Sequence, residues 1–342
     1  MRVAMYYSNQ DIRIEEMPIP AIGPGEMLMR VEASGICGSD VLEWYRRSKA
    51  PLVLGHEVAG QVVKVGVGVS RFKIGDRIVA SHHVPCNTCY YCLSGHHTAC
   101  ETLRQTNFDP GGFSEYIRLP ALNVDRGVFV IPEELSYGEA TFHEPLGCVI
   151  RAQRLADLRP GQSVLVLGCG VAGLLHILLA KASGASRIMA VDIVPYRLKA
   201  AKKLGATEVL MASENINESF RKINSDRLAD LVLVCTGAKQ ALLQALQSVE
   251  RGGTILFFAP TNPGVEISLS INQLFFRNDV TLTTSYGASP NDSYLALELM
   301  RSQVVRVEEM ITHRLPLVKT ALGFKIVEEA RNSIKVIIEP QK

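Results

Sequence analysis

The sequence predicts an α/β protein built from a β-rich, barrel-like unit and a doubly wound parallel-sheet unit. Three observations lead to this class. The chain has 342 residues, enough for roughly two domains. Residues 1–150 are rich in short β-type segments broken by Gly and Pro, whereas strand-like and helix-like segments alternate from residue 151. Such alternation is typical of a parallel sheet with helices on both faces.

In the first half, few stretches keep a helical period, and short β-type segments are separated by turns such as Gly-Pro-Gly. We predict strands at Glu26–Ser34, Glu57–Val65 and Arg77–Ser81. Many short strands with turn residues between them indicate an all-β, barrel-like unit whose loops are free to carry function.

The second half has a different residue pattern, in which β-branched segments alternate with Leu/Ala-rich ones. One helix opens with Pro195 and ends at Gly205, which suits the residue preferences of helix ends. The predicted strands are 163–167, 187–191, 230–235, 253–259 and 280–284, and the predicted helices are 171–183, 195–204 and 239–250. This pattern predicts a parallel sheet within residues 151–287.

The remaining residues, 288–342, do not continue the alternation. They contain a predicted helix at Ser293–Ser302 and a strand at Lys335–Glu339. We therefore assign them back to the first domain, residues 1–150, which makes the parallel-sheet domain an insertion.

The charge balance excludes some partners. Lys and Arg number 36 and Asp and Glu 34, a net charge of +2, whereas nucleic acids and anionic membranes select strongly basic surfaces. The first residues show no charged segment followed by an apolar one, so we expect no signal peptide and a cytoplasmic location. Ser163–Ala182 is nearly apolar over 20 residues, but its glycines favour a strand, a turn and a buried helix over a membrane span.

A glycine-rich turn follows the first strand of the second domain. Gly168, Gly170 and Gly173 form G-x-G-x-x-G between a strand and a helix, an arrangement that binds the pyrophosphate of a dinucleotide. Asp192 ends the next strand, 19 residues after Gly173, where a carboxylate can accept from the adenosine ribose hydroxyls. Its charge favours NAD over NADP, and Arg197 is the nearest basic residue.

Four cysteines form a compact motif in the first domain. Cys86, Cys89, Cys92 and Cys100 lie within 15 residues, and four thiolates on one loop can close a tetrahedral shell around Zn²⁺. A closed shell leaves no position for substrate, so this site is predicted to be structural. An iron–sulfur cluster fits the spacing less well.

A third group of metal-binding residues is spread along the chain. Cys37 lies in Gly-Ile-Cys-Gly-Ser-Asp, His56 and Glu57 lie in Gly-His-Glu, and Glu144 lies in His-Glu-Pro-Leu. One thiolate, one imidazole and carboxylates are the composition of a catalytic zinc site with an open position.

Together these motifs resemble the zinc-dependent medium-chain alcohol and polyol dehydrogenases. Five motifs occur in the family's order along the whole chain, and Glu144 is similar to the sorbitol and threonine dehydrogenase branch. The resemblance implies a GroES-like β-barrel catalytic domain and a Rossmann domain that binds NAD. It also implies two Zn²⁺ ions, one catalytic and one structural.

The resemblance assigns roles to individual residues. Cys37, His56 and Glu57 would ligate the catalytic zinc, with Glu144 as a fourth ligand or as the residue that holds its water. Ser39 would begin the proton relay and Asp40 would orient the neighbouring loop. The implied cofactor-binding residues are Gly168, Gly170, Ala172, Gly173, Asp192, Arg197, Thr236, Ala259, Ser285, Tyr286 and Lys335, the last through the cofactor phosphates.

The implied activity is transfer of a hydride from a secondary alcohol, a polyol or sugar derivative, to NAD⁺. The alternatives are oxidation of an amino alcohol such as L-threonine and a non-enzymatic sensor of NAD and zinc. The resemblance also implies a homo-oligomer, a tetramer or a dimer, with a small-molecule alcohol as substrate. Two departures from the pattern stand out: Leu42 replaces the relay histidine, and the segment from Cys37 to His56, 19 residues, is short.

Overall fold

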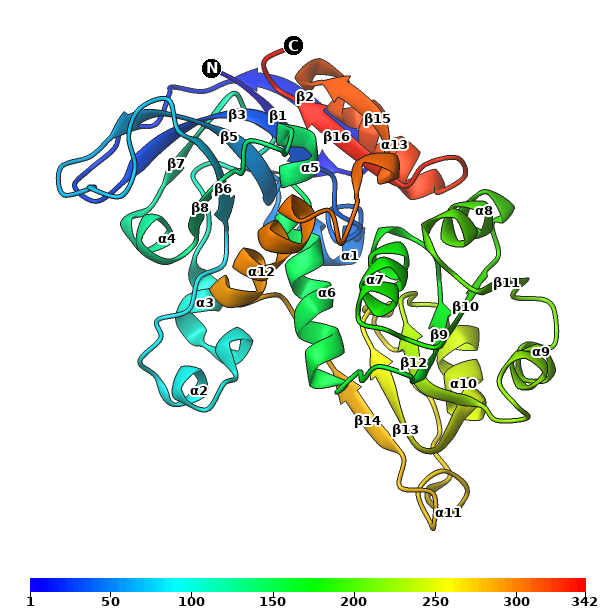
Figure 1. Ribbon diagram of the computed structural model, residues 1–342. Coiled ribbons are helices and arrows are strands. Elements are labelled where there is room, and N and C mark those ends of the chain that lie inside the picture. Colours follow the sequence, from blue (N-terminus) through cyan, green and yellow to red (C-terminus); the bar gives the residue numbers. More distant parts are fainter. The chain divides into compact units, whose positions relative to one another are not determined.

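The computed structural model of the protein describes all residues, 1–342 (Figure 1). It consists of two compact units, one formed by Met1–Gly147 with Gly287–Lys342 and the other by Cys148–Tyr286. The sequence prediction had placed the divisions after residues 150 and 287. The first division falls inside helix α6 (His143–Leu155), so a helix rather than a linker carries the chain from one unit to the other.

The first unit is built from two sheets. A three-stranded sheet has the order β2-β1-β4, and a seven-stranded sheet has the order β15-β16-β3-β5-β6-β8 with β7 paired to β3. The strands are β1 (Arg2–Ser8), β2 (Asp11–Glu16), β3 (Met27–Gly35), β4 (Leu52–Val53), β5 (Glu57–Val65), β6 (Arg77–Ser81), β7 (Tyr116–Leu119), β8 (Val128–Val130), β15 (Ile311–Pro316) and β16 (Lys335–Glu339). The C-terminal strand β16 pairs antiparallel with β3, which ties the tail to the first unit.

Short helices fill the loops of this unit. They are α1 (Glu43–Arg46), η1 (Arg47–Lys49), α2 (Tyr90–Leu93), η2 (His97–Ala99), α3 (Glu101–Gln105), α4 (Ala121–Arg126), α5 (Tyr137–Ala140), α12 (Pro290–Arg301), η3 (Glu308–Met310), η4 (Leu317–Lys319) and α13 (Thr320–Glu329). Helix α12 begins three residues before the predicted Ser293, because Ser289 and Asp292 form a reciprocal capping box and Pro290 occupies the first turn.

The second unit is a six-stranded parallel sheet in the order β11-β10-β9-β12-β13-β14. Its strands are β9 (Ser163–Leu167), β10 (Arg187–Asp192), β11 (Glu208–Met211), β12 (Ala229–Val234), β13 (Val249–Phe257) and β14 (Thr281–Thr284). Its helices are α7 (Val171–Ala182), α8 (Pro195–Leu204), α9 (Ile216–Ile223), α10 (Lys239–Ser248) and α11 (Ile271–Leu274). Helix α7 packs against α8, and α9 against α10, so helices cover both faces. The predicted doubly wound sheet is confirmed.

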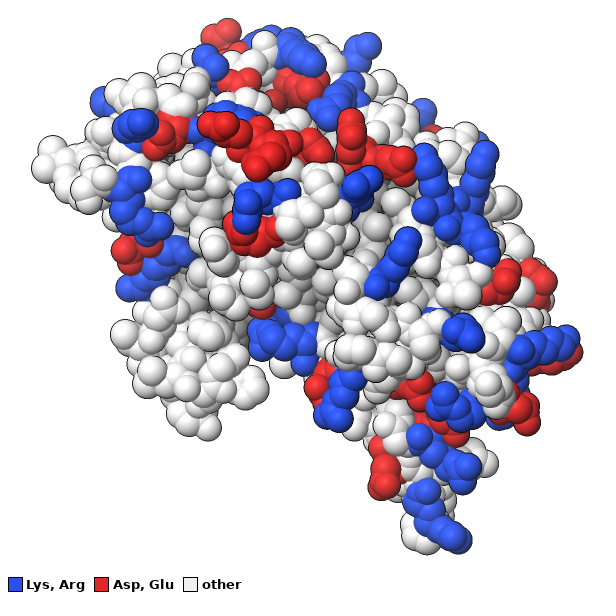
Figure 2. Space-filling model, in the orientation of Figure 1, with Lys and Arg blue, Asp and Glu red and all other residues white.

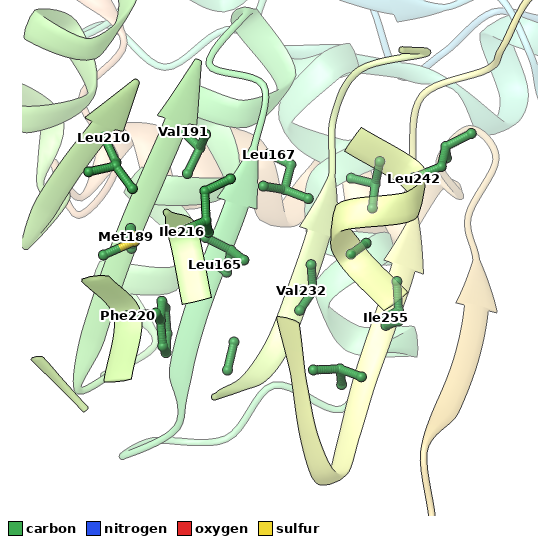
Figure 3. Close-up of a cluster of buried hydrophobic side chains, with 14 of the residues drawn as sticks. Leu165, Leu167, Met189, Val191, Leu210, Ile216, Phe220, Val232, Leu242 and Ile255 are labelled. Atoms are coloured by element: carbon green, nitrogen blue, oxygen red, sulfur yellow. The ribbon is translucent and has the colours of Figure 1, made fainter. Parts of the chain in front are cut away.

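One core of this unit lies between the strands and helices α9 and α10. Figure 3 shows Leu165 of β9 and Val232 of β12 on the side of the sheet that faces Phe220 and Leu242. The central strands β9, β10 and β12 are buried on both faces, as expected for a parallel sheet, and β9 is fully buried along its length. The predicted membrane-length segment, Ser163–Ala182, divides here into β9, the glycine turn and α7, and no helix is long and apolar enough to cross a membrane.

Sequence reasoning left β11 and α9 unassigned. Helix α9 has eight residues, and only Ile216 and Phe220 are buried, so its apolar periodicity is too brief to stand out. Its beginning is marked by Asn215, whose side chain accepts a hydrogen bond from the amide of Glu218 at 3.2 Å. Strand β11 has four residues at the edge of the sheet.

Charges of both signs are interspersed over the surface, in accordance with the net charge of +2 (Figure 2). The lobe of residues 86–100 is an exception, because it contains no Lys, Arg, Asp or Glu, and it forms the white projection at the lower left of Figure 2. Tyr90 and Leu93 are each 77% exposed in this lobe.

Candidate active site

The first unit brings together three of the predicted metal ligands. Cys37 follows the end of β3, His56 precedes β5, and Glu57 is the first residue of β5. Gly35 and Glu57 are paired in the antiparallel register of β3 and β5, so the two strand ends meet. One ligand atom from each of Cys37, His56 and Glu57 lies within 4.8 Å of the others.

Asp40 contacts two members of this group, His56 and Cys37. Its Oδ1 lies 3.4 Å from Nδ1 of His56, and its Oδ2 accepts a hydrogen bond from the amide of Cys37 at 3.0 Å. With Nδ1 facing a carboxylate, Nε2 of His56 is the nitrogen left for a metal, the usual arrangement of a ligating histidine. The predicted orienting role of Asp40 therefore extends to the histidine itself.

The electrostatics favour a cation at this position. Burial alone would lower the pKa of His56, but the Asp40 carboxylate and the Cys37 thiol outweigh it and hold the pKa well above 6.5. Burial alone would likewise raise the pKa of Asp40, but His56 and Arg46 outweigh it and lower that pKa. A site that stabilises positive charge and offers sulfur, nitrogen and oxygen donors fits Zn²⁺.

Glu57 also takes part in a buried ion pair. Its Oε2 contacts the ammonium of Lys335, and both side chains are at most 1% exposed. Lys335 also donates to the carbonyl of Ile36 at 3.2 Å, and a side chain at Gly35 would collide with both members of the pair. The Lys335 ammonium thus contacts Glu57 and the Ile36 carbonyl, beside the three-donor group. Its contact with cofactor phosphates stays a prediction.

The other two residues of the predicted catalytic set, Ser39 and Glu144, belong to the same unit. Glu144 is in the first turn of α6, half-buried, and is not part of the three-donor group. Its role as a fourth ligand stays a prediction. His143 is fully buried, and burial lowers its pKa to about 4, which describes a packed neutral histidine.

Ser39 lies next to the Cys37 thiol. Its Oγ is 3.4 Å from Sγ of Cys37 and receives a hydrogen bond from Nη2 of Arg46 at 3.1 Å. Sequence reasoning missed Arg46, because nothing in the local pattern marks one of several basic residues of α1 and η1 as pointing inward. Leu42, at the position of the expected relay histidine, is the N-cap of α1 and offers no titratable group.

The four cysteines of the other predicted site also converge. Their sulfurs lie within 4.8 Å of one another, and the apolar core of this lobe is limited to the cysteines and Leu103. Hydrogen bonds from Thr88, together with one from the Cys89 amide, lower the pKa of Cys86 to about 5, whereas burial raises that of Cys92 to about 12. Backbone N–H groups directed at sulfur and the scarcity of other core residues fit a lobe held together by a tetrahedral Zn²⁺.

In the second unit, the three glycines of the turn have distinct environments. Gly168 has φ +94° and packs against Thr236. A Cβ at Gly173 would lie 1.9 Å from the carbonyl oxygen of Gly168, so only glycine lets α7 pack on the turn. At Gly170, the N-cap of α7, a Cβ would meet nothing within 4 Å, which leaves open the position where a pyrophosphate approaches the helix N-terminus.

The other predicted cofactor residues lie at the same edge of the sheet. The strands are all parallel, so the residues that follow their carboxyl ends share one edge, and the order reverses between β9 and β12. These residues are Gly168, Gly170, Ala172 and Gly173 after β9, Asp192 and Arg197 at and after β10, Thr236 after β12, Ala259 after β13, and Ser285 and Tyr286 after β14.

Asp192 and Arg197 lie at the expected adenosine end. The Asp192 carboxylate accepts hydrogen bonds from the amides of Cys169 at 2.6 Å and Val194 at 2.8 Å, which fixes its orientation. Nε of Arg197 is buried and has no hydrogen-bond partner in the protein. A buried donor without a partner beside a fixed carboxylate fits a site that a polar ligand completes.

Comparisons with known proteins agree with this geometry. Residues 23–133 match the family described as alcohol dehydrogenase GroES-like domain, and residues 171–302 match the one described as zinc-binding dehydrogenase. The chain is 32% identical to a sorbitol dehydrogenase of Bacillus subtilis, over 100% of this chain and 98% of the relative. It is 34% identical to an L-threonine 3-dehydrogenase of Bacillus velezensis, over 96% and 95%.

Two solved structures extend the comparison to cofactors. An alcohol dehydrogenase from Escherichia coli CFT073 complexed with NADH has a TM-score of 0.88 at 26% identity, with 99% of each chain covered. A zinc-binding dehydrogenase from Sinorhizobium meliloti bound to NADP has a TM-score of 0.87 at 25% identity, also with 99% of each covered. The chain belongs to the family of zinc-dependent medium-chain alcohol dehydrogenases. The predicted family, the GroES-like and Rossmann-type fold and the oxidoreductase class are thereby confirmed.

Proposed function

We propose that this chain oxidises a secondary alcohol, a polyol or sugar derivative, by transferring a hydride to NAD⁺ with the help of zinc. The observation that carries the proposal is the convergence of Cys37, His56 and Glu57 within 4.8 Å, with the Ser39 hydroxyl 3.4 Å from the cysteine sulfur. A metal site with a hydroxyl beside it is what abstraction of a proton from an alcohol requires.

Cys37, His56 and Glu57 would hold the catalytic zinc, and Cys86, Cys89, Cys92 and Cys100 the structural one. When bound, the catalytic ion supplies Lewis-acid polarisation of the substrate hydroxyl, and NAD⁺ supplies the hydride acceptor. Asp40 fixes the tautomer of His56. The Ser39 Oγ stands in position to receive the alcohol proton. Because Leu42 cannot titrate, the proton leaves Ser39 by water or by a cofactor hydroxyl rather than along α1.

NAD is the proposed cofactor rather than NADP. Asp192 is 6% exposed, and its carboxylate is held by two backbone amides at the end of β10. A fixed negative charge there accepts hydrogen bonds from ribose hydroxyls and repels a 2′-phosphate. The second unit would be the NAD-binding domain and the first the catalytic domain.

Oxidation of an amino alcohol such as L-threonine is the second candidate function. The observation in its favour is the 34% identity to an L-threonine 3-dehydrogenase. Leu42 counts against it, because the relay histidine expected in that branch is missing. The two candidates differ in substrate and not in chemistry, so one assay separates them.

We also propose a cytoplasmic homo-oligomer, a dimer or a tetramer. Eight cysteines without a disulfide, four of them gathered in one lobe, suit a reducing compartment. The outer edge of β14 is unpaired within the six-stranded sheet and offers a surface on which two copies could join. Light scattering coupled to gel filtration measures the mass directly, and a mass of one chain would contradict the oligomer.

Metal content and NADH formation test the function together. The wild type should contain two zinc ions per chain, Cys37→Ser one and Cys89→Ser one, while Cys148→Ser, a thiol outside both clusters, should contain two. In a screen of polyols, inositols, sugar acids, simple alcohols and L-threonine, Cys37→Ser should lose NADH formation and Cys148→Ser should keep it. If Cys37→Ser retained two zinc ions and full activity, the catalytic assignment would be wrong.

A further inference from the structure

A basic segment lies beside the proposed metal site. Residues 43–49, which form α1 and η1, carry three basic side chains and a single acidic one, Glu43. The basic side chains are Arg46, Arg47 and Lys49, and Arg47 and Lys49 are exposed with no ion pair. The chain as a whole is nearly neutral, so this local excess of positive charge calls for an explanation.

Arg46 reaches into the site while keeping part of its guanidinium free. Its Nε donates to the carbonyl of Ser39 at 3.0 Å, and its Nη2 donates to Oγ of Ser39 at 3.1 Å and to Oδ1 of Asp40 at 3.2 Å. Its Nη1 has no hydrogen bond in the protein, although the side chain is only 14% exposed. Two N–H donors of a nearly buried guanidinium are therefore available beside the Ser39 hydroxyl.

The free donors are close to the reacting position. Ser39 Oγ contacts both Cys37 Sγ, at 3.4 Å, and Arg46 Nη2, at 3.1 Å. The guanidinium is thus separated from the metal-ligating sulfur by one hydroxyl group. A ligand with a hydroxyl at the metal and an oxyanion at Arg46 needs only a short carbon chain between the two.

A second cation is held next to Arg46. Both cations contact the ring of Tyr45, with Cζ of Arg46 at 4.7 Å and Nζ of Lys49 at 4.3 Å from its centroid. Both cations also act on His83. Burial lowers the pKa of that histidine to about 4, and the positive charges of Arg46 and Lys49 contribute to the lowering. Several acidic groups lie nearby: Asp40, which already contacts Arg46, His56 and the Cys37 amide, Glu57 in the three-donor group, and Glu43 and Glu328, which act on Tyr6 together with Arg46.

We propose that the substrate carries an anionic group, a carboxylate or a phosphate ester, close to the hydroxyl that is oxidised, and that Arg46 Nη1 binds it. The proposal rests on the function proposed above and narrows its substrate class to hydroxy acids of the sugar type or sugar phosphates. The N–H donors of a guanidinium form charge-assisted hydrogen bonds with both oxyanions. Lys49 and Arg47 lie along the exposed rim and raise the local concentration of anions.

Matched substrates test the proposal. We compare kcat/KM for an alditol, the aldonate with the same carbon skeleton and the alditol phosphate, with L-threonine as a fourth arm. A charged hydrogen bond predicts a preference of about tenfold to a hundredfold for one of the two anions over the neutral alditol. Which anion is preferred distinguishes the carboxylate from the phosphate.

Variants separate recognition from support of the loop. Arg46→Gln and Lys49→Gln should each reduce the ratio of anionic to neutral kcat/KM, by about tenfold or more for Arg46→Gln. Lys64→Gln, which removes an exposed cation from β5, should leave the ratio unchanged. If Arg46 only supported the loop, Arg46→Gln would lower kcat/KM for the anionic and the neutral substrate equally, and it would also lower the zinc content. Raising the salt concentration should weaken catalysis with the anion only.

The outcomes distinguish this inference from the function on which it rests. Equal kcat/KM for the alditol and both anions, or an unchanged ratio in Arg46→Gln, overturns the binding of an anionic substrate by Arg46 while leaving the dehydrogenase activity in place. Preference for L-threonine over both sugar anions overturns the narrowing to sugar acids and sugar phosphates, because threonine offers Arg46 a carboxylate on an amino acid instead. If the zinc-loaded protein oxidised none of the alcohols, the proposed function itself would fail.

Discussion

The Glu57 carboxylate takes part in two interactions. It lies in the three-donor group, and its Oε2 contacts the fully buried ammonium of Lys335. Two charges removed from water are tolerated only because each neutralises the other, and removal of one leaves the other uncompensated. The pair therefore links the charge of the metal site to the C-terminal strand β16.

Replacing Lys335 by Met should destabilise the metal-free protein by about 3–5 kcal/mol, because the buried Glu57 carboxylate loses its partner. The double variant Glu57→Gln/Lys335→Met should recover much of this loss, since neither charge is then buried. Urea unfolding with chelator present measures both. If the double variant were as unstable as Lys335→Met alone, the ion pair would not be the cause. Lys64→Gln serves as the control for loss of a surface lysine.

At the scale of residues, the sequence identified those side chains whose neighbours along the chain define their chemistry. Cys37, His56 and the four clustered cysteines belong to short motifs, and the structure brings each set together. Arg46 and the Glu57–Lys335 pair were missed. The pair joins residues 278 positions apart, and no local pattern records a contact that arises only when β16 pairs with β3.

At the scale of elements, the turn between β9 and α7 contains two glycines, Gly173 and Gly170, that are needed for different reasons. A Cβ at Gly173 would lie 1.9 Å from the Gly168 oxygen, which would push α7 away from the turn, whereas a Cβ at Gly170 has free space around it. The first glycine is thus required by packing and the second by access of a ligand.

Gly173→Ala should lower the thermal stability of the second unit, at a cost of about 1–3 kcal/mol for the overpacked contact. Gly170→Ala should leave stability nearly unchanged but weaken NAD⁺ binding, because the methyl group occupies space open to the pyrophosphate. Thermal melts and fluorescence titration of NADH measure the two effects. Equal loss of stability in both variants would contradict the division of roles. Gly161→Ala is an unsuitable control because its φ is +87°, so Ala182→Ser, at the exposed far end of α7, serves instead.

The elements themselves were predicted well where their patterns were long. β9, α8, β5, β6 and β16 have the predicted bounds, since uninterrupted β-branched segments and helix-end residues mark them. Helix α12 began earlier than predicted because a capping box acts through side chains rather than through apolar periodicity. β11 and α9 were missed because each buries too few apolar residues to show a period.

At the scale of the whole molecule, the two units depend on different ligands for part of their stability. The cysteine lobe has almost no apolar core of its own, and the first unit holds both proposed zinc sites. The second unit has an extensive apolar core and needs no metal to form it. Zinc should therefore stabilise the first unit and NAD⁺ the second.

Removal of zinc by a chelator should expose residues 86–105 and the 37–57 segment to hydrogen exchange and leave the peptides of β9, β10 and β12 protected. NAD⁺ at a hundred times its Kd should add about 2.7 kcal/mol to the stability of the second unit, with the protection concentrated at residues 163–197. Exchange mass spectrometry resolves both effects by peptide. Uniform loss of protection on chelation would contradict the assignment of both zinc sites to the first unit.

The pairing of β16 with β3 has a consequence for synthesis of the chain. Strand β3 is made before the second unit, but its partner β16 is made only after it. The second unit is contiguous in sequence and can fold while the first still lacks a strand. The group of Cys37, His56 and Glu57 therefore gains the Lys335 ammonium only after the second unit has been made. A chain cut after residue 287 would hold a complete second unit attached to a first unit that lacks β15 and β16.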